Sequence, residues 1–206
     1  MKKLILAAAA LALSTSAMAG PKWTYADLGY IVGDSGDEDT DGYRVSGSFG
    51  FADIWHVGLN YNDAELNGGQ GSNFAGADAD FFEVSVGVNP ALTDNTDFVF
   101  DVSYFDGSIE SGSGLGASDD DFDGYGLRVG LRSYLTDNME VWGFINSRSG
   151  SIDMGSSPSM DFTDVGVSAG GQYFFTENVS VGADVFLNGV SAADADIANF
   201  FVRYSF

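Results

Sequence analysis

One histidine and several acidic clusters are the side chains of this sequence with the clearest potential for chemistry. The chain contains no cysteine, which excludes disulfide bonds and thiolate metal sites. His56 is the single histidine, and a catalytic histidine needs a nucleophile or a carboxylate partner within hydrogen-bond reach of the substrate. It follows a short turn at 52–54, and no serine at a strand end accompanies it. We therefore interpret His56 as a hydrogen-bonded internal residue and expect no enzymatic activity.

Two acidic segments resemble the beginning of a calcium-binding loop. Segments 37–42 and 119–124 both follow the pattern D-x-D-x-D-G, in which alternate carboxylates precede a glycine turn. The glutamate that completes such a loop at its twelfth position is missing, because Ser48 and Gly130 occupy that place. We therefore predict no cofactor and no specific metal site. The weak candidates for Ca²⁺ binding in external loops are Asp37, Asp39, Asp41, Asp119, Asp121 and Asp123.

A third group of ionisable residues lies inside otherwise apolar segments. Such residues can pair with each other or line a path for ions, depending on the elements that carry them. They share positions in phase with small or polar neighbours. The predicted charge network consists of Asp27, Arg44, Glu83, Asp101, Arg128, Arg132, Asp184 and Arg203.

Alternation of apolar and polar residues predicts that these elements are β-strands with two different faces. In the segment 125–135, for example, Tyr125, Leu127 and Val129 share one face, while Arg128 and Arg132 lie on the other. The phase of 139–149 is ambiguous, because aromatic and aliphatic residues alternate there. The predicted strands are 23–33, 42–51, 55–64, 79–89, 96–106, 123–135, 139–149, 163–175, 179–189 and 197–206.

The lengths of the connections favour a closed antiparallel transmembrane β-barrel. Short turns at 52–54, 90–95, 136–138 and 176–178 alternate with longer segments rich in Gly, Ser and Asp at 34–41, 65–78, 107–122, 150–162 and 190–196. Short periplasmic turns and long external loops are typical of bacterial outer-membrane barrels. We therefore predict an all-β fold of ten strands, with eight as the fallback. A soluble β-sandwich with charged outer faces is the alternative.

The two ends of the chain favour export to a membrane. Residues 1–19 have a basic start, a short apolar core and the cleavage pattern Ala17-Met18-Ala19 of a signal peptide, which leaves residues 20–206 as the barrel domain. In the last strand, Phe200, Val202, Tyr204 and Phe206 share one face. No further segment is expected to cover that face, so a lipid bilayer is the expected partner.

Charge and aromatic residues fit the same prediction. An arginine that faces lipid at mid-depth costs about 2–4 kcal/mol, so the strand arginines should point inwards and pair across the lumen. Aromatic side chains are expected in two belts, one at the short-turn ends of the strands (Phe51, Trp55, Trp142, Phe175, Tyr204 and Phe206) and one near the long-loop ends (Tyr43, Tyr61, Phe82, Tyr104 and Phe200). The formal net charge of −22 excludes nucleic acid as a partner.

Taken as a whole, the chain resembles the small outer-membrane β-barrel proteins of Gram-negative bacteria. The group includes the OmpA transmembrane domain, OmpX-like proteins and porin-like barrels. The opening segment 23–30, together with 41–43, also resembles an Asp-rich proteobacterial subgroup. The resemblance implies that Tyr204 and Phe206 form the signal for the outer-membrane assembly machinery. It also implies that outer-membrane lipids and lipopolysaccharide are partners. Divalent cations would bridge the loop carboxylates to the phosphates of lipopolysaccharide.

Three functions are compatible with that resemblance. The first is an integral outer-membrane protein of porin-like family, with a narrow or plugged lumen and a role in envelope structure or surface interaction. The second is a diffusion channel for small cationic solutes, lined by the predicted charge network. The third is a surface adhesin or receptor that binds through acidic external loops, chiefly 65–78 and 107–122.

Overall fold

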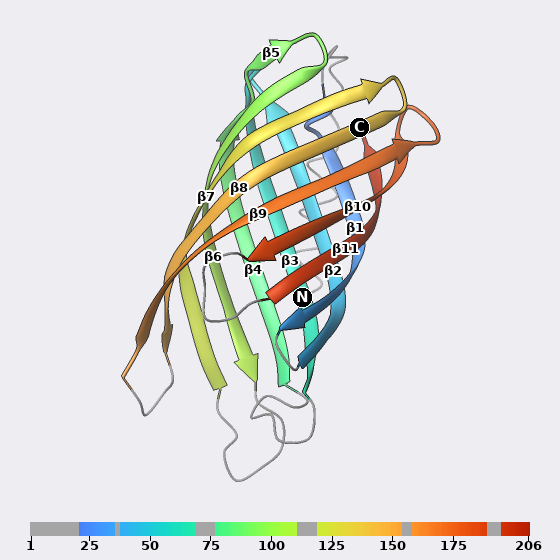
Figure 1. The fold of residues 1–206 in the computed structure, drawn as a ribbon. Coiled ribbons are helices and arrows are strands. Elements are labelled where there is room, and N and C mark those ends of the chain that lie inside the picture. The colour runs from blue at the N-terminus through green and yellow to red at the C-terminus, as the bar shows by residue number, and fades with distance from the viewer. Residues whose placement is uncertain (1–20, 36–37, 69–76, 111–118, 154–157, 189–194) are drawn as a thin grey trace.

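The computed structural model describes residues 21–35, 38–68, 77–110, 119–153, 158–188 and 195–206. All regular elements in these ranges are β-strands, which run antiparallel to their neighbours (Figure 1). The strands are β1 (Tyr25–Ser35), β2 (Glu38–Phe51), β3 (Trp55–Gly68), β4 (Ala77–Val88), β5 (Ala91–Thr93), β6 (Thr96–Glu110), β7 (Asp119–Thr136), β8 (Met139–Asp153), β9 (Met160–Phe174), β10 (Val179–Asn188) and β11 (Ala195–Ser205).

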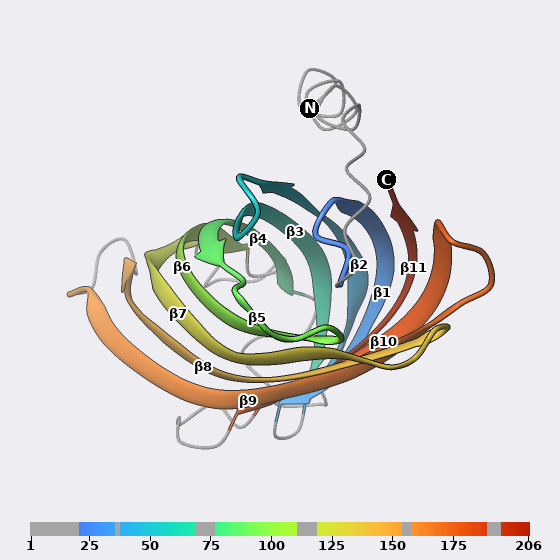
Figure 2. The ribbon, with the colours of Figure 1, turned by 90° about the horizontal axis from the view of Figure 1, so that it is seen from above.

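The sheet closes into a barrel of ten long strands. Each strand pairs with its neighbours in the chain, and β1 pairs with β11 over 25–35 and 195–205. The short strand β5 lies in the turn between β4 and β6, which pair directly with each other. Figure 2 shows the strands curving around a common interior. The predicted ten-stranded antiparallel barrel is confirmed, and the fallback of eight strands is wrong.

All long strands except β10 are longer than predicted at one end. At the end that carries the short turns, here called the turn end, the predicted bounds lie within about two residues of the observed ones. At the opposite end, here called the loop end, β6 extends to Glu110 and β7 begins at Asp119, so both ends of the predicted loop 107–122, residues 107–110 and 119–122, are strand. Asp39 and Asp41 likewise belong to β2 rather than to a loop. Continued backbone pairing explains the correction, because polar outward residues do not prevent strands from extending beyond the apolar zone.

Side chains alternate between lipid-facing and lumen-facing positions as the sequence predicts. In β11, Phe200, Val202 and Tyr204 are exposed on the outer face, whereas Phe201 and Arg203 are buried inside. The outer surface carries a band of exposed apolar side chains from all ten long strands, which is the surface of a transmembrane barrel. Among the described residues, no helix has the length and apolar character required to cross a membrane.

The aromatic belts are confirmed with one exception. Phe51, Trp55, Phe175 and Tyr204 are exposed at the turn end, and the second belt of Tyr43, Tyr61, Phe82, Tyr104 and Phe200 is exposed around the middle of the strands, on the loop-end side of the first belt. The exception is Trp142, which lines the lumen cavity and has its ring centre 6.0 Å from that of Phe201. The register of β8 with β7 and β9 turns Val141 and Ile145 to the outer face. The alternate residues of β8 therefore point inward, namely Glu140, Trp142, Phe144 and Arg148.

Candidate functional site: the barrel lumen

The first lumen layer lies at the turn end and is built around Trp23. This residue precedes β1, yet its indole Nε1 donates a hydrogen bond to Asp97 Oδ2 on β6 at 2.7 Å. Its ring stacks on His56 of β3 with ring centres 4.1 Å apart, and the Arg132 guanidinium of β7 lies 4.7 Å from the ring centre. Strands β2, β3 and β4 separate β1 from β6 in the barrel. The segment before β1 therefore reaches across the interior and fills it.

His56 is the centre of a buried polar chain. Its Nε2 lies 2.5 Å from Asp101 Oδ1, and its Nδ1 lies 3.0 Å from the side-chain amide of Asn89. Asp101 also accepts a hydrogen bond from Arg128 Nε at 2.6 Å. Gly87 leaves the space for this chain, because an added Cβ would collide with Asp101 Oδ1 and lie 2.7 Å from His56 Cε1. Both imidazole nitrogens are engaged, and His56 is only 1% exposed.

Two buried ion pairs complete the turn-end layer. Arg203 of β11 binds Asp27 of β1 through two hydrogen bonds of 2.6 and 2.7 Å, and its guanidinium lies 3.5 Å from the Tyr25 ring centre. Arg132 binds Glu140, with its Nη2 at 3.2 Å from Oε2. Glu140 also accepts a hydrogen bond from Gln172 at 2.6 Å. Such fully bonded geometry is what makes charge tolerable inside a barrel wall, since desolvation of each ion is costly.

The middle of the lumen holds a more open set of ion pairs. Arg44 of β2 lies 3.4 Å from Asp184 of β10, and Arg148 Nη2 of β8 lies 3.3 Å from Glu83 Oε2 of β4. Three strand spacings separate the partners in each pair, so these pairs bridge the lumen rather than adjacent strands. A cavity of about 260 Å³ lies among them and extends to Trp23 at its turn-end limit.

An aromatic cluster fills one side of the lumen at the loop end. Its members are Phe81 (β4), Phe105 (β6), Phe122 (β7) and Phe162 (β9). Ring centres lie 5.8 Å apart for Phe81–Phe105 and 6.2 Å apart for both Phe81–Phe122 and Phe105–Phe162. Phe105 is 1% exposed. The cluster is a small hydrophobic core that connects β4, β6, β7 and β9 on the loop-end side of the ion pairs.

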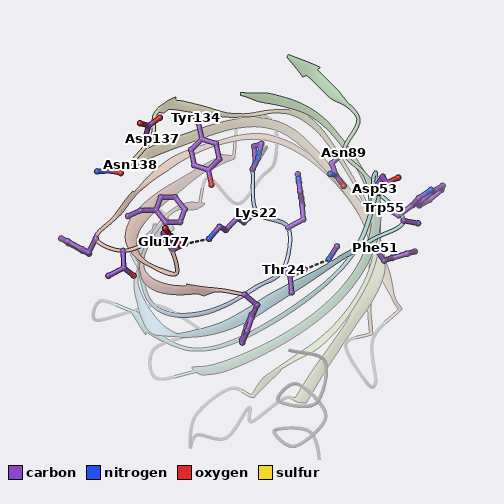
Figure 3. A pocket seen from close by; sticks show the side chains of 18 residues that line it. Lys22, Thr24, Phe51, Asp53, Trp55, Asn89, Tyr134, Asp137, Asn138 and Glu177 are labelled. Atoms are coloured by element: carbon purple, nitrogen blue, oxygen red, sulfur yellow. Dashed lines mark hydrogen bonds between the residues drawn. The ribbon is translucent and has the colours of Figure 1, made fainter. Parts of the chain in front are cut away.

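A second cavity of about 730 Å³ opens at the turn end (Figure 3). Lys22 points into it and donates a hydrogen bond to the backbone oxygen of Glu177, while Thr24 Oγ1 accepts one from Gly50 N at 3.2 Å. Trp55 and Phe51 point away from this cavity, toward the outside of the barrel. Trp23 lines both cavities and separates them.

All eight members of the predicted charge network occupy the lumen, and each has an ionic partner. Together with Glu140 and Arg148, which were not predicted, they form the five pairs Asp27–Arg203, Arg44–Asp184, Asp101–Arg128, Glu83–Arg148 and Arg132–Glu140. Sequence reasoning left Glu140 and Arg148 out because the phase of their strand was ambiguous. It also missed Asp97 and the role of Trp23 in filling the lumen. The available signal was that an inward-facing tryptophan needs an acceptor for its indole N–H, which Asp97 provides.

The candidate calcium ligands do not form a metal site among the described residues. Asp41 accepts a hydrogen bond from the Tyr30 hydroxyl at 3.0 Å, and Asp123 accepts one from Ser151 at 3.5 Å. An extended strand keeps alternate carboxylates in a row and cannot wrap them around an ion. Asp37, the side chain of Asp119, the signal peptide 1–19 and the loop centres 69–76 and 111–118 lie outside the described residues.

Comparisons with known proteins address the fold. No protein-family model and no curated protein match the sequence. Among solved structures, the translocator domain of the autotransporter NalP from Neisseria meningitidis is 11% identical, with a TM-score of 0.50 over 100% of this chain and 94% of that domain. Ail, the attachment invasion locus protein of Yersinia pestis, is 12% identical, with a TM-score of 0.44 over 90% of this chain and all of Ail. The KdgM porin is 14% identical, with a TM-score of 0.39 over 87% of this chain and 99% of the porin.

At such low identity, these similarities concern architecture and say nothing about activity. The match to the NalP domain spans the whole chain and agrees with the closed sheet and the apolar outer band described above. The resemblance to outer-membrane barrels is thereby confirmed at the level of fold. The chain has the fold of the outer-membrane β-barrel proteins, as a closed antiparallel barrel of ten strands.

Proposed function

We propose that this protein is an integral outer-membrane barrel with a sealed lumen, which acts in envelope structure or surface interaction rather than in transport. The observation that carries the proposal is the turn-end layer, in which Trp23 contacts His56, Asp97 and Arg132 across the interior. A solute that crossed the barrel would have to displace this ring and the buried ions around it.

The buried ion pairs argue against the alternative of a channel for cationic solutes. That function needs a continuous aqueous path along the predicted charge network. Asp27, Arg132 and Arg203 are each no more than 6% exposed as whole residues, and their charges are neutralised by direct contacts. Desolvated and paired charges offer a passing cation neither hydration nor net attraction.

The engagement of His56 supports a function without catalysis. Asn89 and Asp101 occupy its two nitrogens, and Trp23 covers its ring. A general base must reach the proton that it abstracts, within hydrogen-bond distance or through one water. Because its contacts with Asn89, Asp101 and Trp23 bury His56, we assign it to the structure of the plug.

The outer surface indicates the partners that we propose. Lipid contacts the exposed apolar band, and the assembly machinery recognises Tyr204 and Phe206 at the end of β11. The turn end then faces the periplasm, and the acidic loop end faces lipopolysaccharide, with divalent cations bridging carboxylates to phosphates. A cleaved signal peptide in residues 1–19 would deliver the chain to this location.

Conductance tests the proposal directly. The mature protein, residues 20–206, is refolded and inserted into a planar bilayer, with and without millimolar Ca²⁺, and folding is checked by heat modifiability in gel electrophoresis. We expect no stable conductance steps from the wild-type protein. Trp23→Ala removes the ring that fills the turn-end layer and should produce openings, whereas Trp55→Ala, which changes an outward tryptophan at the same end, should remain silent.

Frequent cation-selective steps from the folded wild-type protein would refute the sealed lumen and support the channel function. A silent wild-type protein together with a silent Trp23→Ala variant would assign the seal to the ion pairs instead. Calcium-dependent steps would contradict the prediction that the acidic segments form no specific metal site.

A further inference from the structure

The mid-lumen cavity combines features of a ligand site that the sealed-barrel function does not require. Its volume of about 260 Å³ is close to the lower limit for small-molecule sites, about 300 Å³. Arg44, Arg128 and Arg148 line it from β2, β7 and β8. We propose that this cavity binds a small organic carboxylate with a flat apolar part.

The three arginines present more of their charge to the cavity than their acidic partners Glu83, Asp101 and Asp184, which also line it. The side chains of Arg44, Arg128 and Arg148 are 27%, 39% and 37% exposed, against 20% for Asp184, 3% for Asp101 and 19% for Glu83. Although the sequence has a formal charge of −22, the accessible ionic groups of this cavity are therefore mainly guanidinium groups. An anion is the ligand that such a wall attracts.

These guanidinium groups also retain hydrogen-bonding capacity. Each has five N–H donors. Within the described part of the chain, Arg128 donates to Asp101 through Nε, and Arg148 donates to Glu83 through Nη2. Arg44 donates to Asn60 through Nε and to Asp184 through Nη1. Donors remain on each group, and a planar guanidinium can bind a carboxylate through two parallel hydrogen bonds.

The remaining walls favour a flat, apolar body attached to that carboxylate. Trp142, Phe144 and Phe186 line the cavity, and Arg128 lies 4.8 Å from the Phe144 ring centre. Arg148 lies 5.7 Å from the Phe186 ring centre. Aromatic faces accept an offset-stacked ring at low cost, because they need no hydrogen-bond partner of their own. A benzoate-sized molecule matches both the charge and the walls.

The position of the cavity makes it a pocket rather than part of a pore. Trp23 closes its turn-end limit, so a ligand must enter from the loop end. In contrast to the cavity, the outward positions near that end carry carboxylates such as Asp63, Asp80, Asp106 and Asp123. Their field reaches about 8 Å at physiological ionic strength. Once an anion has passed these outward carboxylates, the guanidinium groups of the cavity provide the local attraction that holds it.

Calorimetric titration of the refolded mature protein in detergent tests this site with benzoate as the probe. We expect saturable binding of one benzoate per chain, with a Kd on the order of 1 mM or tighter. Benzamide and benzylammonium have the same ring without the negative charge, and neither should bind in the same range. Titration into protein-free micelles corrects for partition of benzoate into detergent.

Two substitutions should shift the affinity in opposite directions. Arg148→Gln removes charged donors and should weaken benzoate binding about tenfold or more, since hydrogen bonds to charged groups are the strong ones. Glu83→Gln removes the carboxylate that competes for Arg148 and should tighten binding. Lys22→Gln changes a cation at the turn end, outside the cavity, and should leave the Kd unchanged.

No saturation with benzoate up to about 10 mM on the folded wild-type protein would overturn the proposal. Equal binding of benzamide would overturn it as well, because it would show that the walls alone hold the ring. A Kd that responds to Lys22→Gln as strongly as to Arg148→Gln would also contradict it, since the attraction would then be a general effect of charge. The comparison of benzoate, benzamide and benzylammonium uses the wild-type protein alone, so it does not depend on whether any variant folds.

Discussion

The ion pair Asp27–Arg203 joins the first and last strands of the barrel, and its removal provides a quantitative test of how the barrel is closed. Both side chains are almost fully buried, with 4% of Asp27 and 7% of Arg203 exposed, and two hydrogen bonds of 2.6 and 2.7 Å connect them. Asp27→Asn would leave a buried guanidinium without its counter-charge. Loss of one partner of a buried pair costs about 3–5 kcal/mol in the free energy of unfolding.

A double substitution distinguishes the energy of the ion pair itself from the cost of leaving one buried charge without its partner. Replacement of both residues, as Asp27→Leu with Arg203→Met, removes the two charges together. The result should be close to the wild-type stability or above it, because a buried ion pair and an apolar pair of similar volume are often equivalent. The coupling energy between the two positions should then exceed about 2 kcal/mol, which is within the range for residues in direct contact.

Equilibrium unfolding in urea, with the protein in lipid vesicles and tryptophan fluorescence as the signal, measures these differences. Asp184→Asn is the matched control, because the Arg44–Asp184 contact is 3.4 Å long and both side chains are at least 20% exposed. It should cost no more than about 1 kcal/mol. If Asp27→Asn also costs less than about 1 kcal/mol, or if the double variant loses as much as the single one, the seam is held by backbone pairing alone.

Three further predictions concern the lumen layers and the outer surface. Gly87→Ala should lose about 1–3 kcal/mol in urea unfolding, since the added methyl collides with the His56–Asp101 contact; Gly143→Ala, which meets nothing within 4 Å, should be neutral, and equal losses would contradict the steric argument. Phe105→Ala should lose about 3–5 kcal/mol, because it empties the centre of the aromatic cluster; a loss below about 1 kcal/mol would show that the cluster does not act as a core. Carboxylates lie directly opposite each other at Asp63–Asp80, Asp106–Asp123 and Asp121–Asp153, so the thermal midpoint should rise between about 0.01 and 0.15 M salt as their repulsion is screened; a falling midpoint in calorimetry would assign the salt effect to the ion pairs.

The outer face of the barrel could be predicted almost completely from the sequence. Lipid favours an apolar residue at every second position, and the strand 125–135 follows that rule at each outward position except Ser133. The same alternation placed Asp27, Glu83, Asp101 and Asp184 inside, where they now have partners. The exception is β8, where Trp142 and Phe144 are as apolar as the lipid-facing Val141 and Ile145. Period-two reasoning fails when the lumen itself is aromatic.

The contents of the lumen could be predicted only in kind. Pairing of the arginines follows from the cost of isolated charge, but the choice of partner depends on register and on distance across the barrel. Arg148 finds Glu83 on a strand three places away, and nothing in the local sequence indicates that contact. The role of Trp23 was hidden for a related reason. The alternation assigns it to β1, whereas its contacts lie on β3, β6 and β7.

The arrangement of the five strand arginines follows the depth of the lumen and accounts for its two different halves. Arg132 and Arg203, at the turn end, are buried and bound by two-pronged contacts, so they contribute to a seal. Arg44, Arg128 and Arg148 lie nearer the loop end, and their contacts to carboxylates leave much of each guanidinium accessible. A pore would need accessible charge along its whole length. Accessible charge above a closed layer instead forms a pocket with one entrance, and this is why a silent barrel and an anion site are compatible properties of the same lumen.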